Sequence, residues 1–418
     1  MQRTLFTNAL LLDGENEPRP NTSVVVEGER ITAVEAGPIT PRAGDRHIDL
    51  AGKTLMPGLI TSHYHSTYHD ITVQPAPLGL EKPAGYLALV AAANLRKALS
   101  SGFTSVVSAG GIGDDIDAQC QLAIKEGIIE GPRMIAGGQG LDVPGGYSDA
   151  EAGVWWWALG NHGGHRFCSG PEAFRSAVRE QTRRGVQIIK IFPSGGHGAE
   201  LPHTGVSLTP DELTAICETA HQRGALVRAH SPMKDSILAC IRAGVDIIDH
   251  GDELDEECIE LMLAHGTSLV PSMYFIERLL KDVGNDGEAT PSQLAPIREG
   301  FEQIRKMLPI ANQAGVRILI GDDYGINILS HGRYTEELAF YVDNVGIAPL
   351  DVIRWATRNG AEMMGLGDEL GLVAPGRLAD LLVVAGNPVA EIELLQDASR
   401  IEAIIQNGVF YKDALPDG

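Results

Sequence analysis

The sequence predicts an α/β protein, in which a TIM-like (β/α)8 barrel is joined to a small β-sandwich domain formed by both chain ends. Strand and helix signals alternate along the middle of the chain, which is typical of βα units around a parallel sheet. Short β-type runs separated by turns occupy both ends instead. A length of 418 residues suits one large barrel with a smaller appended domain.

The first 55 or so residues predict a small β meander, with strands at residues 5–12, 23–27, 30–34 and 47–50. The tail from about Gly371 repeats this character, with strands at residues 381–384 and 401–406. We therefore expect residues 1–56 and 368–418 to form one β-sandwich domain, and residues 57–367 to form the barrel.

Eight apolar stretches between the two ends are typical of strands, and eight strands close a barrel. They are residues 54–61, 104–108, 133–136, 186–192, 225–229, 245–249, 268–271 and 317–320. Helical patterns fill the gaps, for example at residues 84–99, 171–183, 210–222, and 275–313 with breaks near Gly284 and Pro291. The helix at 210–222 has a clear start, because Thr209, Pro210 and Glu212 form a capping-box pattern.

Composition excludes several classes of function. The net charge of −22 disfavours nucleic acid and anionic membranes as partners. No apolar run reaches membrane-spanning length, and the N-terminal segment lacks the apolar core and cleavage site of a signal peptide. Five cysteines without a Cys-x-x-Cys pair disfavour a disulfide framework and a zinc ribbon. We expect a cytoplasmic enzyme that acts on a small molecule.

The stretch from Pro57 to His65 indicates a metal site at the end of a strand. His63 and His65 are one residue apart, so on an extended backbone both imidazoles project from the same face. A His-x-His pair also occurs on polar surfaces and beside structural hydrogen bonds. Further strand ends favour the metal, because the carboxyl ends of barrel strands meet at one mouth.

Four of these strands carry a polar residue at the same end: Lys190, His230, His250 and the pair Asp322-Asp323. Each one alone is more often a satisfied histidine or part of a buried ion pair, but the agreement of five strand ends favours a shared site. Lys190 is the informative member, since a protonated lysine has no acceptor for a cation and is costly to bury unpaired. It must be neutral, paired or modified.

At these residues the chain resembles the metal-dependent amidohydrolase superfamily over essentially its whole length, from Pro-Gly-Leu-Ile-x-x-His-x-His to Gly376-Arg377-Leu378. Within it, the phrases Ile191-Phe-Pro-Ser-Gly-Gly and Val245-Asp-Ile-Ile-Asp-His-Gly are most similar to the imidazolonepropionase-related branch with Xaa-Pro dipeptidase (prolidase)-like enzymes. The resemblance implies two divalent metal ions, expected to be zinc, bridged by a carboxylated Lys190. It also implies a homo-oligomer.

The resemblance further implies a ligand set and a catalytic group. The implied metal ligands are His63, His65, Lys190, His230, His250 and Asp323. Asp323 is also the implied catalytic residue, which accepts a proton from water and passes it to the leaving nitrogen. Asp322 takes the ligand position if the register slips by one.

Two positions depart from the family pattern. The usual aspartate after Pro-Gly-Leu-Ile is Thr61 here, which changes the support available to the histidines. Peptidase relatives carry a tyrosine after the strand-five histidine that grips a substrate carboxylate, where this chain has Ser231-Pro232-Met233. The second departure puts peptidase specificity in doubt.

Substrate-side candidates follow strands or share their faces, and each has a structural alternative. Trp157, within Trp155-Trp156-Trp157 and near His162 and His165, either covers the barrel mouth or packs on it. Arg228 shares the face of His230 and meets either an internal carboxylate, which we favour, or a substrate carboxylate. The remaining candidates, which either contact substrate or belong to the packed or solvated surroundings, are His197 with His203, Tyr274, and His331 with Tyr334.

These observations predict a hydrolase that cleaves a carbon–nitrogen amide-type bond with metal-activated hydroxide. The substrates expected are N-acyl amino acids, Xaa-Pro-like dipeptides or aryl amides. One alternative is a deaminase or a cyclic-amide or urea hydrolase, including mononuclear relatives, although a lysine on strand four counts against a mononuclear site. A more distant alternative is a non-catalytic structural protein on the same fold, which a loss of ligands would favour.

Overall fold

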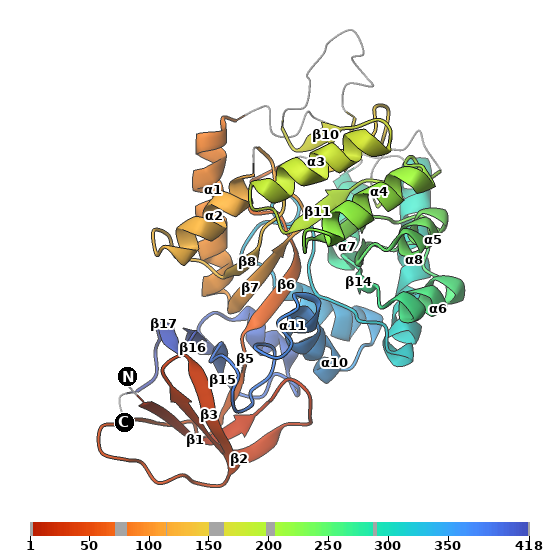
Figure 1. Cartoon of the computed structure of the whole chain (residues 1–418). Coiled ribbons are helices and arrows are strands. Elements are labelled where there is room, and N and C mark those ends of the chain that lie inside the picture. The colour runs from red at the N-terminus through yellow and green to blue at the C-terminus, as the bar shows by residue number, and fades with distance from the viewer. Residues whose placement is uncertain are drawn as a thin grey trace.

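A computed structural model gives the structure of residues 3–71, 82–113, 115–149, 163–197, 205–286 and 291–416. A sheet that contains both chain ends lies beside a larger α/β part (Figure 1). Nothing is described for residues 155–157, 162 or 203, so the predictions for these tryptophans and histidines lie outside the described residues. Within those residues, no helix is both long enough and apolar enough to cross a membrane.

The chain ends share one sheet, which has eight strands over the described residues, in the order β17-β16-β15-β5-β1-β2-β3 with β4 beside β1. Its strands are β1 Arg3–Leu11, β2 Arg19–Glu27, β3 Arg30–Ala36, β4 Arg46–Asp49, β5 Lys53–Pro57, β15 Leu381–Ala385, β16 Ile401–Gln406 and β17 Val409–Asp413. The meander prediction is confirmed for β1, β2 and β3, which pair antiparallel. It is wrong for β4, which runs parallel to β1. Strand β5, which overlaps the stretch predicted as the first barrel strand, also runs parallel to β1.

The apolar side chains on one face of this sheet form a core of their own. Val24 and Val26 on β2 are two residues apart, so they point to the same face, where they join Phe6, Leu381 and Ile405 in one buried cluster. The strands of the two chain ends are therefore held together by shared burial as well as by the hydrogen bonds between β5 and β15.

The predicted strand at residues 54–61 is wrong as a single element, because the chain passes between two sheets at Gly58. Before it, β5 pairs antiparallel with β15, and after it β6, Leu59–Tyr64, pairs parallel with β7. A Cβ on Gly58 would lie 2.2 Å from Thr104 Oγ1, so the crossing point has room only for glycine. The apolar run gives no sign of this change of sheet, because the residues before and after Gly58 are buried alike.

The larger part contains two sheets in which every strand pairing is parallel, ordered β6-β7-β8 and β10-β9-β11-β12-β13-β14. The remaining strands are β7 Phe103–Ser108, β8 Arg133–Ile135, β9 Gly140–Asp142, β10 His165–Phe167, β11 Ile188–Ile191, β12 Leu226–His230, β13 Ile247–Asp249 and β14 Ser268–Val270. Seven of the eight predicted strands therefore have a counterpart, and β9 and β10 were not predicted. Residues 317–320 form no assigned strand, although Leu319 N donates to Leu269 O at 2.9 Å and Ser62 N donates to Ile320 O at 2.6 Å.

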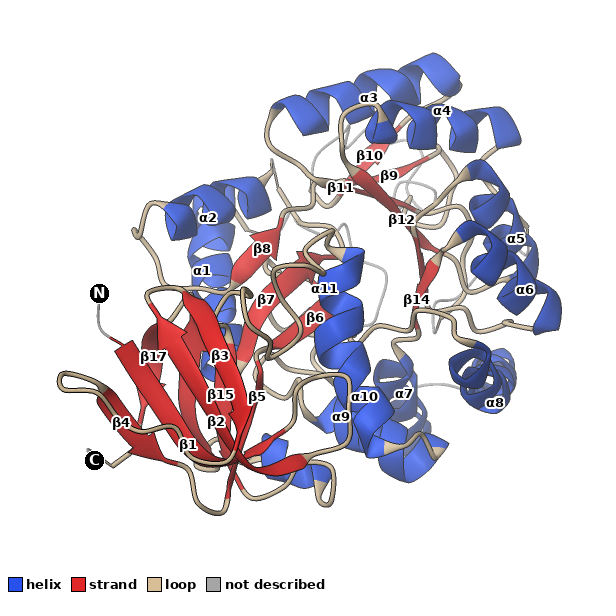
Figure 2. Cartoon of the chain, turned by 60° about the horizontal axis from the view of Figure 1, so that its bottom comes forward, coloured by secondary structure: helices blue, strands red, loops and turns tan. Residues whose placement is uncertain are grey.

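Helices lie on the outer side of these strands (Figure 2). They are α1 Ala84–Ser100, α2 Ile116–Lys125, α3 Pro171–Arg183, α4 Pro210–His221, α5 Lys234–Ala243, α6 Glu256–His265, α7 Met273–Asp286, α8 Pro291–Ala314, α9 Glu336–Phe340, α10 Pro349–Arg354 and α11 Gly360–Met363, with the single-turn elements η2 Tyr341–Val345, η3 Trp355–Asn359 and η4 Ile392–Gln396. The predicted capping box of α4 is confirmed, since Thr209 accepts from Glu212 N while the Glu212 side chain accepts from Thr209 N. The break expected near Gly284 is misplaced, because α7 continues to Asp286.

Candidate metal centre and active site

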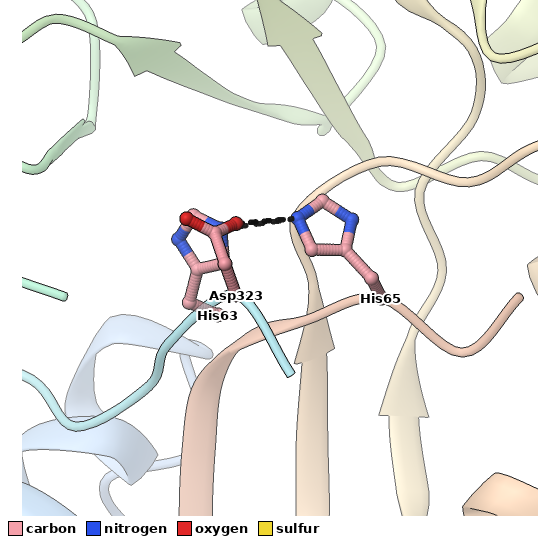
Figure 3. Close-up of side chains that lie close together, drawn as sticks. All are labelled: His63, His65 and Asp323. Carbon is pink, nitrogen blue, oxygen red and sulfur yellow. Dashed lines mark hydrogen bonds and ion pairs between the residues drawn. The ribbon is translucent and has the colours of Figure 1, made fainter. Parts of the chain in front are cut away.

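Three side chains from two segments that are far apart in the sequence meet at one point (Figure 3). The Nε2 atoms of His63 and His65 are 3.1 Å apart. Asp323 Oδ1 lies 3.1 Å from His63 Nε2 and 3.2 Å from His65 Nε2. His63 belongs to β6 and His65 follows it, so the expected shared face of this strand brings both rings to the carboxylate that follows residues 317–320.

The proton positions at this point favour a cation. His65 Nδ1 lies 2.8 Å from the carbonyl oxygen of Gly110, which only accepts, so Nδ1 carries the proton and Nε2 carries a lone pair. His63 Nδ1 lies between Asp249 Oδ1 at 3.3 Å and Arg228 Nη2 at 3.2 Å. When Nδ1 donates to Asp249, His63 Nε2 carries a second lone pair, and two imidazole lone pairs and a carboxylate oxygen converge with no proton among them. A divalent ion fits this donor set.

Burial favours the neutral form that a metal needs in three histidines of the site, His65, His230 and His250. It lowers the pKa of His65 to about 4, against the opposing effect of Asp323. Burial also holds the pKa of His230 and of His250 well below the ordinary value, and the nearby Lys190 and His197 add to this for His230. The Nε2 of His230 and the Nδ1 of His250 are buried without a hydrogen-bond partner in the described part of the chain.

A second group of three side chains lies beside the first. One nitrogen each of His197 and His250 and an oxygen of Asp323 lie within 4.8 Å of one another. The ring of His250 is 4.5 Å from that of His230 and 5.5 Å from that of His63, measured between centroids. His250 therefore lies between His63 at one end of the site and His230 at the other.

Lys190 lies within the same cluster but contacts a carboxylate. Its Nζ donates to Asp249 Oδ2 at 2.6 Å and lies 5.2 Å from the centre of the Phe192 ring. Burial lowers the pKa of Lys190, although Asp249 opposes the change. Of the three states that the sequence left open for this lysine, the structure contains the paired one.

Asp249 accepts hydrogen bonds from buried side chains of the site, a role that was not predicted from the sequence. It accepts from Lys190, from Arg228 Nε at 3.0 Å and from the Arg228 terminal nitrogen Nη2, and all of these groups are buried. Burial opposes the ionisation of Asp249, but Arg228 and Lys190 outweigh it and hold its pKa well below the usual value. The hydroxyl of Thr61, in contrast, donates to the carbonyl of His63 at 3.4 Å. The position of Asp249 directly before His250 was the available signal.

Aromatic rings line the same site. Tyr68 stacks on His65 with ring centroids 4.0 Å apart, and Tyr147 stacks on His230 at 4.6 Å. Phe192 lies 5.5 Å from His230 and 5.0 Å from His165. Tyr68 and Tyr147 come from loops without a distinctive motif, so they were not singled out from the sequence.

The remaining predicted substrate contacts are Arg228, Tyr274 and His331. Each of them binds neighbouring groups of the protein. Arg228 uses all three guanidinium nitrogens internally, on Asp249 and on the carbonyls of Ser62 and Ser108, so it makes the internal ion pair we favoured instead of a contact open to substrate. Tyr274 donates its hydroxyl to Glu336 at 2.6 Å. His331 Nδ1 lies 2.9 Å from the Tyr334 hydroxyl, and its ring is 5.3 Å from that of Tyr64.

Asp322 and Asp323 face different surroundings, and of the two it is Asp323 that lies beside the histidines. Asp323 meets His63 and His65, whereas Asp322 is fully buried and accepts from Phe275 N at 3.0 Å and Asp323 N at 2.8 Å. Burial and the neighbouring Glu337 raise the pKa of Asp322 well above the ordinary value. Burial acts in the same direction on Asp323, but His63 and His65 outweigh it and hold the pKa of Asp323 well below the ordinary value.

Comparison with known proteins identifies the family of this chain. The model of the amidohydrolase family matches residues 54–410. The chain belongs to the amidohydrolase family. It is 28% identical to ochratoxinase of Aspergillus niger over 98% of this chain and 86% of the relative. It is 22% identical to imidazolonepropionase of Cutibacterium acnes over 94% of this chain and 91% of the relative.

A similar solved structure is a Xaa-Pro dipeptidase with methionine bound in its active site, which is 28% identical, with a TM-score of 0.86 over 98% of this chain and 100% of the other. The resemblance expected from the sequence, to the amidohydrolases and to their imidazolonepropionase and prolidase-like branch, is confirmed.

Proposed function

We propose that this protein is a metal-dependent hydrolase that cleaves the carbon–nitrogen bond of an N-acyl amino acid or a Xaa-Pro-like dipeptide, with aryl amides as a further substrate class. The observation that carries the proposal is the convergence of His63 Nε2, His65 Nε2 and Asp323 Oδ1 within 3.2 Å, on a chain of the amidohydrolase family. The relatives support the substrate class, since an amino acid occupies the active site of the Xaa-Pro dipeptidase.

The ligands would be His63, His65, His230, His250, Asp323 and a carboxylated Lys190, which together would hold two divalent ions, with zinc the expected metal. When bound, such ions lower the pKa of water and polarise the substrate carbonyl. Support for carboxylation comes from the burial of Lys190, which lowers the amine pKa and so favours the neutral form that reacts with carbon dioxide. The nitrogen then gains a bond to carbon and releases a proton.

Asp323 would move the proton of the reaction. Its low pKa keeps it ionised at neutral pH, so it is able to accept the proton of the attacking water. Water adds to the carbonyl carbon, the carbon–nitrogen bond breaks, and Asp323 returns the proton to the leaving nitrogen, so that an acid and an amine are released.

Around this site we propose the division expected from the sequence, with a β-sandwich of residues 1–56 and 368–418 and a barrel of residues 57–367. Closure of the barrel is supported by hydrogen bonds from residues 317–320 to both β14 and β6, and by the 2.8 Å bond from Gln187 N to Ala136 O between β8 and β11. The homo-oligomer and the cytoplasmic location stay predictions.

A deaminase, or a hydrolase of cyclic amides or ureas, is the second candidate, because the same donors would serve those substrates. Metal analysis of the purified protein, combined with a screen of N-acyl amino acids, Xaa-Pro dipeptides, aryl amides, ureas and lactams, tests both candidates. We expect bound divalent metal and release of an amino acid from an N-acyl substrate. Ammonia release from a ring amine without amide cleavage would favour the deaminase, and no turnover with full metal content would favour a binding protein.

A further inference from the structure

His197 lies in the loop after β11 and turns its side chain into the site. The side chain is 2% exposed, and its backbone has a φ of 54°, a left-handed conformation that residues other than glycine rarely adopt. The ring of His197 stacks on that of His250 with centroids 3.7 Å apart and planes 23° apart. His197 therefore adopts an unfavourable backbone conformation, and in that conformation its imidazole packs against His250, a proposed metal ligand.

Asp252 fixes which nitrogen of His197 faces the site. Its Oδ1 lies 3.0 Å from His197 Nδ1, and a carboxylate only accepts, so Nδ1 carries the proton. In the neutral ring, Nε2 then presents a lone pair. Nε2 is buried and has no hydrogen-bond partner in the described part of the chain. A carboxylate behind one ring nitrogen with a lone pair on the other is the usual arrangement of metal-binding histidines.

The alternative is a protonated ring that links Asp252 and Asp323. In that case Nε2 would donate to Asp323, but the distance from His197 Nε2 to Asp323 Oδ2 is 3.8 Å, which is too long for a hydrogen bond. The same distance leaves space for an ion that both atoms contact. His250 completes this group, since its Nδ1 is also buried without a partner among the described residues.

We propose that His197 is a further ligand of the divalent ion on the His250 side of the site, and that Asp252 orients it. This inference rests on the proposed metal-dependent function. His250 and Asp252 belong to the same short loop after β13, so one loop supplies a ligand and also the carboxylate that positions its neighbour. His230, whose ring is 6.5 Å from that of His197, would then contact the same ion from another side.

The experiment is a titration of the metal-free protein with Zn²⁺ and with Co²⁺, in competition with a chromophoric chelator, for wild type, His197→Gln and Asp252→Asn. Loss of an outer carboxylate typically weakens metal binding roughly 10- to 100-fold, so we expect that change for Asp252→Asn and at least that change for His197→Gln. The weaker binding should concern one equivalent of metal, and the visible spectrum of bound Co²⁺ should change. Circular dichroism checks folding.

The matched control is His221→Gln, which removes another histidine–aspartate pair, His221 Nε2 with Asp246 Oδ2 at 2.9 Å, away from the site. It should bind both metals as wild type does. If His197→Gln and Asp252→Asn keep wild-type affinity, stoichiometry and Co²⁺ spectrum, His197 is not a ligand, and a raised KM alone would make it a substrate contact. A wild-type protein that binds neither metal would instead overturn the proposed function itself.

Discussion

Replacing Asp323 and Asp322 separately by Asn tests the proton transfer. Asp323→Asn keeps the shape at the two histidines and removes the base, and the loss of such a group typically costs about 10²- to 10⁴-fold in rate, or about 2.7–5.5 kcal/mol of barrier. Asp322→Asn should behave differently, because burial and Glu337 already raise the pKa of Asp322 and favour the neutral form that Asn imitates. We expect its rate to stay within about tenfold of wild type.

The two variants should also differ in stability. Both oxygens of Asp322 accept backbone N–H groups, from Phe275 and Asp323, and the amide of Asn replaces one acceptor by a donor. Loss of one buried acceptor costs about 1–3 kcal/mol in the free energy of unfolding, which urea denaturation measures. Initial rates with an N-acyl amino acid and metal content complete the assay. A lost rate in Asp322→Asn with an unchanged rate in Asp323→Asn would refute the assignment and shift the catalytic role to Asp322.

Three further predictions concern Lys190, Asp249 and Glu337. Lys190→Ala should lose most bound metal and activity, and short carboxylic acids should restore part of each; full metal content and rate without them would contradict a bridging Lys190. In the metal-free protein, where Lys190 carries no carboxyl group, Asp249→Asn leaves Arg228 and Lys190 buried beside a neutral group, so urea denaturation should report a loss of about 3–5 kcal/mol, whereas a loss below about 1 kcal/mol would mean that this ion-pair cluster adds little. Burial raises the pKa of Glu337 to about 8, so wild-type stability should fall as pH rises from the ordinary carboxyl value toward 8. Glu337→Gln lacks this ionisation and should gain stability relative to wild type between pH 5 and pH 8, and an equal difference at both pH values would contradict the shift.

Local patterns predicted the parts of the site that depend on strand geometry. Alternation along a strand placed His63 and His65 on one face, and the Gly-Asp-Asp sequence placed a carboxylate where a strand ends. Both features depend on a few neighbouring residues and on the rule that parallel strands present their carboxyl ends together. The structure brings these three residues to one point for the same reasons.

Other features depend on contacts between distant residues and were not predictable. Asp249 contacts His63 across 186 residues of sequence, and no local pattern encodes such a contact. The change of sheet at Gly58 depends on the close approach of Thr104, and the inward turn of His197 depends on an unusual backbone angle. Residues 317–320 have a strand-like sequence. Within the described part of the chain they form one isolated β-bridge, between Ile318 and Leu269, which is too short for a regular strand.

The central claim is that metal held by these residues activates water for cleavage of an amide. Its most direct test is hydrolysis of an N-acyl amino acid in ¹⁸O-labelled water by the metal-free protein, before and after Zn²⁺ is restored. The proposed function predicts no cleavage without metal, and cleavage with one ¹⁸O in the released acid once metal is bound. Cleavage at the same rate in the metal-free protein, or a released acid without ¹⁸O, would contradict it.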